Sequence, residues 1–267
     1  MHLYCRSTIL KSKGATLKKL ISLILAISVL LTMCIPAAAA SESPMTLQEA
    51  TAITAAGVEC ELQAKGTSIT KELTDMNKYY LEMASLADTS EEEQKCMDLA
   101  DTIAQLLDEY ASYTANLAAN VQTTGSNDAY YAVAVAAIVT WFNGNDCLLA
   151  SELLTRAKDN TVLDSKYTPI HKTKIINNPI VRDFMDSNSP KGSGEFEASK
   201  SLDLYYAIHL FNWEKDDNVF IFSDRYDYEL GDQSYPDSIA EAAVYTMARA
   251  QRDGYITPYY VYVRVNM

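Results

Sequence analysis

The sequence predicts an α+β fold, in which an N-terminal antiparallel helical hairpin precedes an α+β domain with a small, mainly antiparallel sheet. Two consecutive heptad seams lie in the first half of the chain, and short, alternating, aromatic-rich segments lie near its C-terminus. A stretch rich in Thr, Gly, Ser and Asn at 122–128 separates the two parts. Helices followed by strands, without regular alternation, are typical of the α+β class.

The first 40 residues have the order of a secretory signal peptide. Basic residues precede an apolar stretch, Leu20–Ile35, and alanines then lead to a cleavage site that we expect after Ala40. The stretch is shorter than the roughly 20 residues of a spanning helix, so we expect no permanent membrane span. Cys34 raises lipid attachment as an alternative, although Met33 stands where a small residue is usual. We expect a secreted or cell-envelope, extracytoplasmic protein.

Charge and cysteine usage exclude several classes of function. The net charge is −13, and no acidic residue precedes Glu42, so the chain beyond the signal is more acidic still. Such a surface repels nucleic acids and anionic membranes. Three cysteines follow the signal, Cys60, Cys96 and Cys147, which is too few for a disulfide framework. The likeliest single bridge joins Cys60 and Cys96, and no zinc-type spacing is present, so we expect no metal or cofactor.

Capping boxes and heptad seams define the N-terminal helices. Thr46 and Glu49 form a capping box that opens a helix over 47–64. Ser90 and Glu93 form a second box, between two apolar seams. The seam residues are Ile69, Leu73, Met76, Tyr80, Met83 and Ala87, and then Cys96, Leu99, Ile103, Leu106, Tyr110, Tyr113 and Leu117.

A short turn between two long seams makes the helices antiparallel neighbours, so we expect a hairpin of 68–87 and 91–119. The seams also offer a surface for self-association. We divide the chain beyond the signal into a helical hairpin region, 41–122, and a C-terminal α+β domain, 127–267.

The periodicity of apolar residues predicts the helices and strands of the C-terminal domain. A buried core helix and a second helix are expected first, then two strands of a hairpin, a helix and a final strand. These elements span 129–142, 147–158, 203–213, 219–223, 236–254 and 259–265. Residues 161–200 have no clear pattern.

The catalytic candidates are Cys147, His209 and Asp224. Cys147 follows Asp146 at a predicted helix start, where free amides and the helix dipole lower the pKa of a thiol. We expect His209 and Asp224 on adjacent strands, as a thiol nucleophile with a base and an orienting acid requires. This order resembles papain-like cell-wall peptidases of the NlpC type, whose cysteine follows an aspartate. The resemblance implies a thiol hydrolase acting on cell-wall peptide, although Leu148 stands where that family has a small polar residue.

A second motif overlaps the first. Asp224, Tyr226 and Asp227 have the Asp-x-Tyr-Asp spacing of colicin M-like enzymes, which cleave the lipid-linked cell-wall precursor. The His-Arg pair of that family is replaced here by Gln233 and Ser234, so we favour a strand end whose aspartates cap a turn.

Aromatic and acidic density gives the binding candidates. Trp213, Tyr226 and Asp227 lie in the aromatic sheet segment, which suits a surface ligand such as a peptide or glycan. Acidic residues crowd the same hairpin but lack calcium-loop spacing, so a solvated acidic face is favoured. These residues are Asp216, Asp217, Asn218, Asp224, Asp227, Glu229 and Asp232.

Two functional hypotheses follow. The favoured one is a non-catalytic interaction or binding module, in which the hairpin mediates association and the sheet recognises a ligand. The alternative is the thiol hydrolase of Cys147, His209 and Asp224.

Overall fold

A computed structural model describes residues 45–118, 127–228 and 238–267. The chain divides into two compact units, Met1–Glu49 and Ala50–Met267. The first is described only at residues 45–49, so the arrangement below concerns the second. The predicted signal peptide and most of the predicted 122–128 break lie outside the described residues. The predicted boundary between 41–122 and 127–267 therefore stays a prediction.

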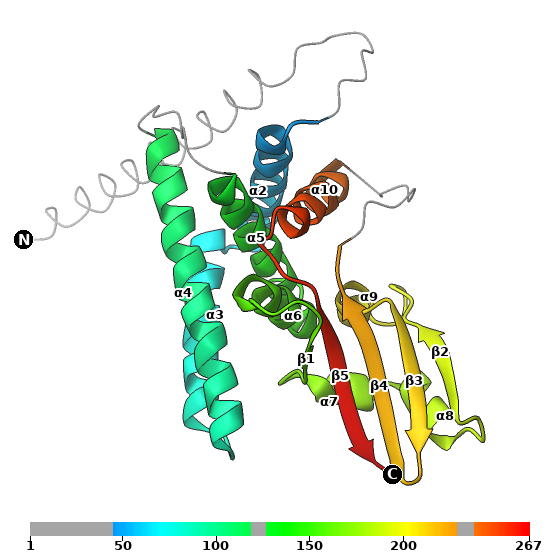
Figure 1. Cartoon of the computed structure of the whole chain (residues 1–267). Helices are drawn as coiled ribbons and strands as arrows, with labels where there is room; N and C mark the ends of the chain where they lie inside the picture. The colour runs from blue at the N-terminus through cyan, green and yellow to red at the C-terminus, as the bar shows by residue number, and fades with distance from the viewer. Residues whose placement is uncertain (1–44, 119–126, 229–237) are drawn as a thin grey trace, which may run out of the picture. The chain divides into compact units, whose positions relative to one another are not determined.

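The helical hairpin is confirmed. After α2 (Leu47–Ala64) come α3 (Ile69–Ser85) and α4 (Ser90–Ala118), which pack side by side as antiparallel neighbours (Figure 1). The seams face each other, and most of their members are buried, namely Ile69, Leu73, Met76, Tyr80, Cys96, Leu99, Ile103 and Leu106. The two seams thus serve as partners for one another within the chain.

The helix caps agree with the sequence with one exception. Glu49 Oε2 accepts from the Thr46 amide at 2.9 Å, and Thr46 Oγ1 accepts from the Glu49 amide at 3.2 Å, so the predicted capping box is confirmed. At α4 the hydroxyl of Thr89 accepts from the Glu92 amide at 3.2 Å. The predicted cap at Ser90 is therefore one residue too late.

The helix α5 (Asp128–Asn143) is the centre of the helical layer. It packs against α3, α4, α6 (Leu148–Asp159) and α10 (Ser238–Arg252). Almost every side chain from Tyr131 to Phe142 is buried, which confirms the predicted core helix. Among the described residues, no helix combines the length and apolar character needed to cross a membrane.

The sheet has the strand order β1-β5-β4-β3-β2. Among the described strands, only the pair of β1 and β5 is parallel, so the sheet is mainly antiparallel, as expected. The strands are β1 (Ser165–Tyr167), β2 (Lys191–Glu195), β3 (Leu210–Asp216), β4 (Val219–Tyr226) and β5 (Tyr259–Asn266). Three short helices accompany them, α7 (Lys172–Ile176), α8 (Pro179–Asp186) and α9 (Leu202–Ala207).

One face of the sheet, the inner face, is a buried aromatic layer. Phe184 of α8 stacks on Trp213 with ring centroids 5.2 Å apart, and Phe196 stacks on Phe211 at 4.7 Å. The hydroxyl of Tyr259 donates to the carbonyl of Leu153 on α6 at 2.8 Å. Helices therefore cover this face, and the alternate side chains of each strand form an outer face that is exposed or partly exposed.

The predicted strand over 203–213 is wrong in its first half. Ser201 caps α9 by accepting from the Leu204 amide at 3.3 Å, and β3 starts only at Leu210. Buried Asp203 and Leu204 lie on this helix, which packs against α6. Tertiary contact has overridden the weak strand preference of a short aromatic segment.

Candidate functional site

Cys147 lies where the sequence predicts it, at the start of α6, but its thiol is buried. The residue is 1 % exposed, and its Sγ contacts the carbonyl oxygen of Asn145 at 3.5 Å. Burial raises the pKa of the Cys147 thiol to about 11, with Asp203 adding to the effect. The expected lowering by the helix start is wrong, because desolvation outweighs the dipole. All three described cysteines are free thiols, so the expected bridge between Cys60 and Cys96 does not form.

His209 lies between α9 and β3 rather than within a strand. Its backbone has a left-handed φ of 56°. Its Nε2 lies 3.2 Å from Glu195 Oε1, and its ring packs on Tyr205 with centroids 4.9 Å apart. In the described part of the chain, no polar contact joins His209 to Cys147 or Asp224. Its contacts are those of a residue in the turn between α9 and β3.

Asp224 lies on β4, opposite Val261 of β5, and shares the inner face with Phe222 and Tyr226. Burial raises the pKa of its carboxyl to about 8, and Asp227 adds to the rise. A carboxyl on this buried aromatic face is costly as an anion, so the protein holds it close to its neutral form.

The predicted binding residues are mainly core residues. Trp213 and Tyr226 are each 5 % exposed, and Tyr226 stacks on Tyr259 at 5.4 Å. The indole N–H of Trp213 has no hydrogen-bond partner among the described residues. Asp227 pairs with Arg225. The aromatic density that suggested a ligand surface therefore serves mostly to pack the inner face.

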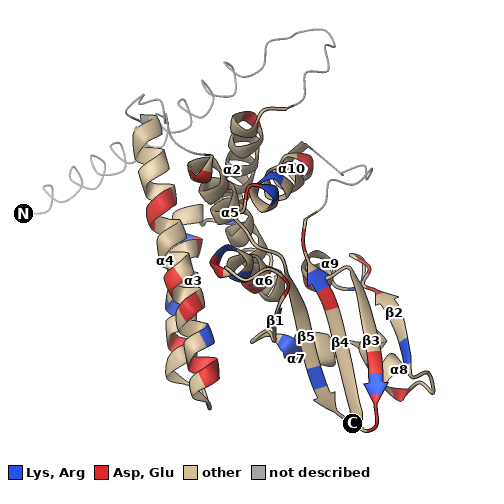
Figure 2. Cartoon of the chain, in the orientation of Figure 1, with Lys and Arg blue, Asp and Glu red and all other residues tan. Residues whose placement is uncertain are grey.

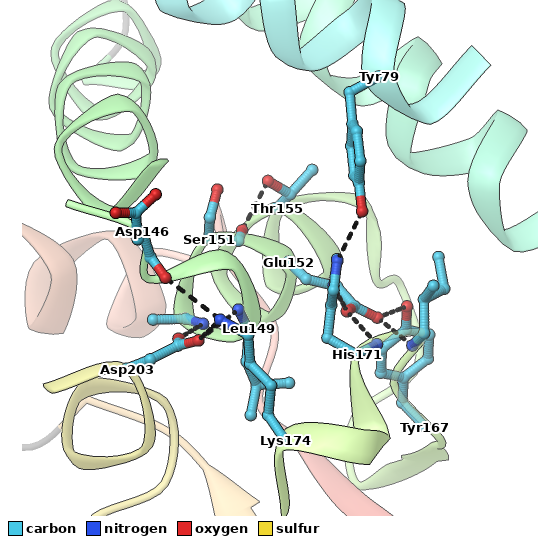
Figure 3. Close-up of polar contacts among 12 residues, drawn as sticks. Tyr79, Asp146, Leu149, Ser151, Glu152, Thr155, Tyr167, His171, Lys174 and Asp203 are labelled. Atoms are coloured by element: carbon cyan, nitrogen blue, oxygen red, sulfur yellow. Dashed lines mark hydrogen bonds and ion pairs between the residues drawn. The ribbon is translucent and has the colours of Figure 1, made fainter. Parts of the chain in front are cut away.

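A buried polar cluster on α6, which the sequence does not predict, joins α6 to the segment between β1 and α7 (Figure 3). The side chain of Glu152 is fully buried. Its Oε1 accepts from Tyr167 Oη at 2.7 Å and from the Ile170 amide at 2.6 Å. Its Oε2 accepts from the His171 amide at 3.0 Å and faces His171 Nδ1 at 2.6 Å. About four acceptor positions exist on a carboxylate, and all are used here.

His171 extends this cluster to the helical hairpin. A carboxylate only accepts, so the Nδ1 that faces Glu152 carries the proton. The Nε2 lies 3.0 Å from Tyr79 Oη on α3, and burial raises the pKa of Tyr79, with Glu152 adding to the rise. An acid, a histidine and a hydroxyl in line resemble a catalytic triad in connectivity, but the hydroxyl is the phenol of Tyr79 rather than a serine hydroxyl or a cysteine thiol.

A second set of contacts fixes the start of α6. Cys147 occupies the N-cap position without a side-chain hydrogen bond, and Asp203 of α9 takes over that role. Its carboxylate accepts from the Leu149 amide at 3.2 Å and the Ala150 amide at 2.9 Å, and it pairs with Lys174 of α7. These are the amides that an N-cap side chain usually satisfies. The positive end of α6 is therefore occupied by a residue of the protein itself.

The sequence held only a weak signal for this cluster. Glu152 interrupts the apolar run of α6, and a charge at a core position of a helix indicates a buried partner. That partner, His171, falls in the 161–200 stretch that had no assignable pattern. The contact joins residues 19 positions apart, which periodicity does not reveal.

The remaining candidate surface is the outer sheet face, defined here as Asn212, Ser223, Tyr260, Tyr262 and Arg264. The register places Asn212, Ser223 and Tyr262 in one row across three strands. Tyr260 is 37 % exposed, and Lys166 lies over the Tyr262 ring at 4.4 Å. This face combines aromatic, amide, hydroxyl and guanidinium groups.

No group of three or more His, Cys, Asp or Glu side chains suited to a metal ion occurs among the described residues. Of the acidic hairpin residues considered for calcium, Glu229 and Asp232 lie outside the described residues. Comparisons with protein-family models, curated proteins and solved structures find no match for this chain.

Cysteine alkylation tests the burial of Cys147. We expect Cys60, which is exposed, to react with iodoacetamide at pH 8, and Cys147 to stay unmodified until the protein is denatured, because its thiol is buried and protonated. Peptide mass spectrometry reads each site separately. Fast reaction of Cys147 at pH 6 would contradict the burial of its thiol and would favour the thiol-hydrolase hypothesis.

Replacing the central carboxylate tests the Glu152 cluster. Glu152→Gln turns one acceptor oxygen into an amide donor that faces other donors, so we expect a loss of about 2–4 kcal/mol in the free energy of unfolding. Urea denaturation measures it. The matched control is Glu82→Gln, whose side chain is 63 % exposed, and its expected effect is below about 0.5 kcal/mol. Equal effects of the two variants would refute a central role for Glu152.

The half-buried Asp224 carboxyl makes stability depend on pH. Because its folded pKa lies above the unfolded value, its favourable contribution is complete below about pH 4 and is lost as the pH rises to about 8. Asp224→Asn should therefore stabilise the protein by about 3 kcal/mol at pH 7 and little at pH 4. Thermal unfolding across pH 4–8 measures this, with exposed Asp216→Asn as the control. A gain independent of pH would contradict the assignment.

Proposed function

We propose that this chain is an exported, non-catalytic recognition module that binds an uncharged glycan of the cell envelope on its outer sheet face. The observation that carries the proposal is the contrast between the two faces of one sheet. The inner face is closed by helices, whereas the outer face presents Tyr260, Tyr262 and Asn212 in adjoining rows. Tyrosine rings offer apolar area beside a hydroxyl, which suits the alternating faces of sugar rings.

Charge favours a neutral ligand. The helix α4 carries a series of acidic residues, whereas the sheet has basic and acidic residues interspersed (Figure 2). The net charge of −13 repels anionic polymers. Amide and hydroxyl groups on the outer sheet face then supply the directed hydrogen bonds that a hydroxyl-rich ligand requires.

The basic, apolar and small-residue order of positions 1–40 supports export, although these residues lie outside those described. The hydrolase alternative has less support, because the thiol of Cys147 is buried and its pKa is raised to about 11. The polar cluster of Glu152 also has its acceptor positions filled by the protein.

Titration calorimetry with neutral oligosaccharides of hexose and N-acetylhexosamine tests this proposal. We expect binding that falls at least about tenfold in the Tyr260→Ala, Tyr262→Ala double variant, because both rings leave the face. The matched control is Tyr206→Ala, since Tyr206 is 40 % exposed but lies on α9.

Binding that survives in the double variant would place the ligand elsewhere on the molecule. Absence of binding to every neutral glycan, together with binding to extended cell-wall peptides, would replace the glycan by a peptide as the ligand.

A further inference from the structure

The strand β2 is the last strand of the sheet within the described residues, so one of its edges has no neighbouring strand. Two backbone hydrogen bonds flank its pairing with β3. The Phe196 amide donates to the His209 carbonyl at 2.7 Å, and the Lys215 amide donates to the Pro190 carbonyl at 2.7 Å. Together with the antiparallel register, these bonds fix which residues of β2 face its partner.

Hydrogen-bonded and non-hydrogen-bonded pairs alternate along an antiparallel ladder. Since Pro190 and Phe196 belong to hydrogen-bonded pairs, Gly192 and Gly194 do as well. Lys191, Ser193 and Glu195 therefore direct their N–H and C=O groups to the free edge. The edge thus offers a regular series of donors and acceptors to another strand.

The two glycines of β2 are explained by packing on the inner face. A Cβ at Gly192 would lie 2.8 Å from the Trp213 ring, and one at Gly194 would lie 2.4 Å from the Phe211 ring. The alternate residues, Lys191, Ser193 and Glu195, are exposed. The same three residues thus supply both the free backbone groups and the accessible side chains of this edge.

We propose that this edge pairs with the β2 edge of a second copy of the chain, so that the two sheets become continuous across a two-fold axis at Ser193. Antiparallel pairing about Ser193 places Lys191 of each copy opposite Glu195 of the other. It also pairs the edge-facing N–H and C=O groups of both copies with each other. The strand is therefore complementary to itself in backbone hydrogen bonding and in charge.

The alternative role of charges on an edge strand is to prevent association. Charges of the same sign at positions 191 and 195, which oppose each other across the two-fold axis, would repel a second copy. Here these positions carry Lys191 and Glu195, which have opposite charges, and the Glu195 side chain remains 59 % exposed beside His209. Opposite charges directly across two strands stabilise the pair. This charge pattern favours a second copy over an unrelated peptide.

A short edge buries little area, so the association is expected to be weak and to depend on protein concentration. It is independent of glycan binding on the outer sheet face. Failure of one proposal leaves the other intact, because different residues and different measurements test them.

Sedimentation velocity over a concentration series provides the first test. It uses the protein purified after any natural processing in the cell. We expect a monomer–dimer equilibrium that Lys191→Glu weakens about tenfold, because two carboxylate pairs then oppose each other. Adding Glu195→Lys should restore association by exchanging the charges. Lys78→Glu, at a position 76 % exposed on α3, makes the same charge change as a control.

Cross-linking provides the second test and detects weak association. Residues in a hydrogen-bonded antiparallel pair have Cα atoms about 5.5 Å apart, within the range of a disulfide. Ser193→Cys in a Cys60→Ser background should therefore form a disulfide-linked dimer on mild oxidation. Ser199→Cys, at an exposed position beyond β2, should not.

A chain that stays monomeric and gives no excess of Ser193→Cys dimer over the Ser199→Cys control would overturn the proposal. Dimers that Lys191→Glu leaves unchanged would also overturn it, because association would then occur through another surface. The heptad seams would be the next surface to examine in that case.

Discussion

The described fold depends on one buried carboxylate. Glu152 lies at the centre of α6 without exposed side-chain surface, and an isolated charge in that position would be prohibitively costly. Hydrogen bonds from Tyr167, Ile170 and His171 offset that cost and bring the β1 edge and the segment before α7 against α6. Through His171 the same carboxylate reaches Tyr79 of the helical hairpin, so helices and sheet share one polar anchor.

The buried Glu152 carboxylate also explains why α6 holds the fold together and offers no open group to a ligand. Its positive end is capped by Asp203, and its one interior carboxylate is saturated, so neither feature remains open to a substrate. Cys147 is enclosed by the same packing. Functional groups are left on the surfaces that the anchor does not reach, namely the outer sheet face and the free edge of β2. We propose recognition as the role of these two surfaces.

Much of the fold follows from local pattern, and little of the site does. The seams from Ile69 to Leu106 and the apolar run of α5 predict the helical part because burial imposes their periodicity. The predicted strand at 203–213 is wrong in its first half because the contact of Asp203 with α6 is a tertiary effect, whereas the cap at Ser201 is a local helix signal. Trp213 and Tyr226 suggested a ligand, yet they pack the core, since aromatic density has the same composition in both roles. The pair of Glu152 and His171 has no sequence signature because its spacing belongs to no regular element.

Hydrogen exchange at the amides of Ile170 and His171 tests the role of the Glu152 anchor most directly. Both amides lie outside helix and strand ladders, and each donates to the buried carboxylate. If Glu152 anchors the fold, these amides exchange as slowly as those of the central strands and open only with global unfolding. Exchange as fast as in an exposed loop would show that the segment detaches from α6 on its own, and would contradict the account.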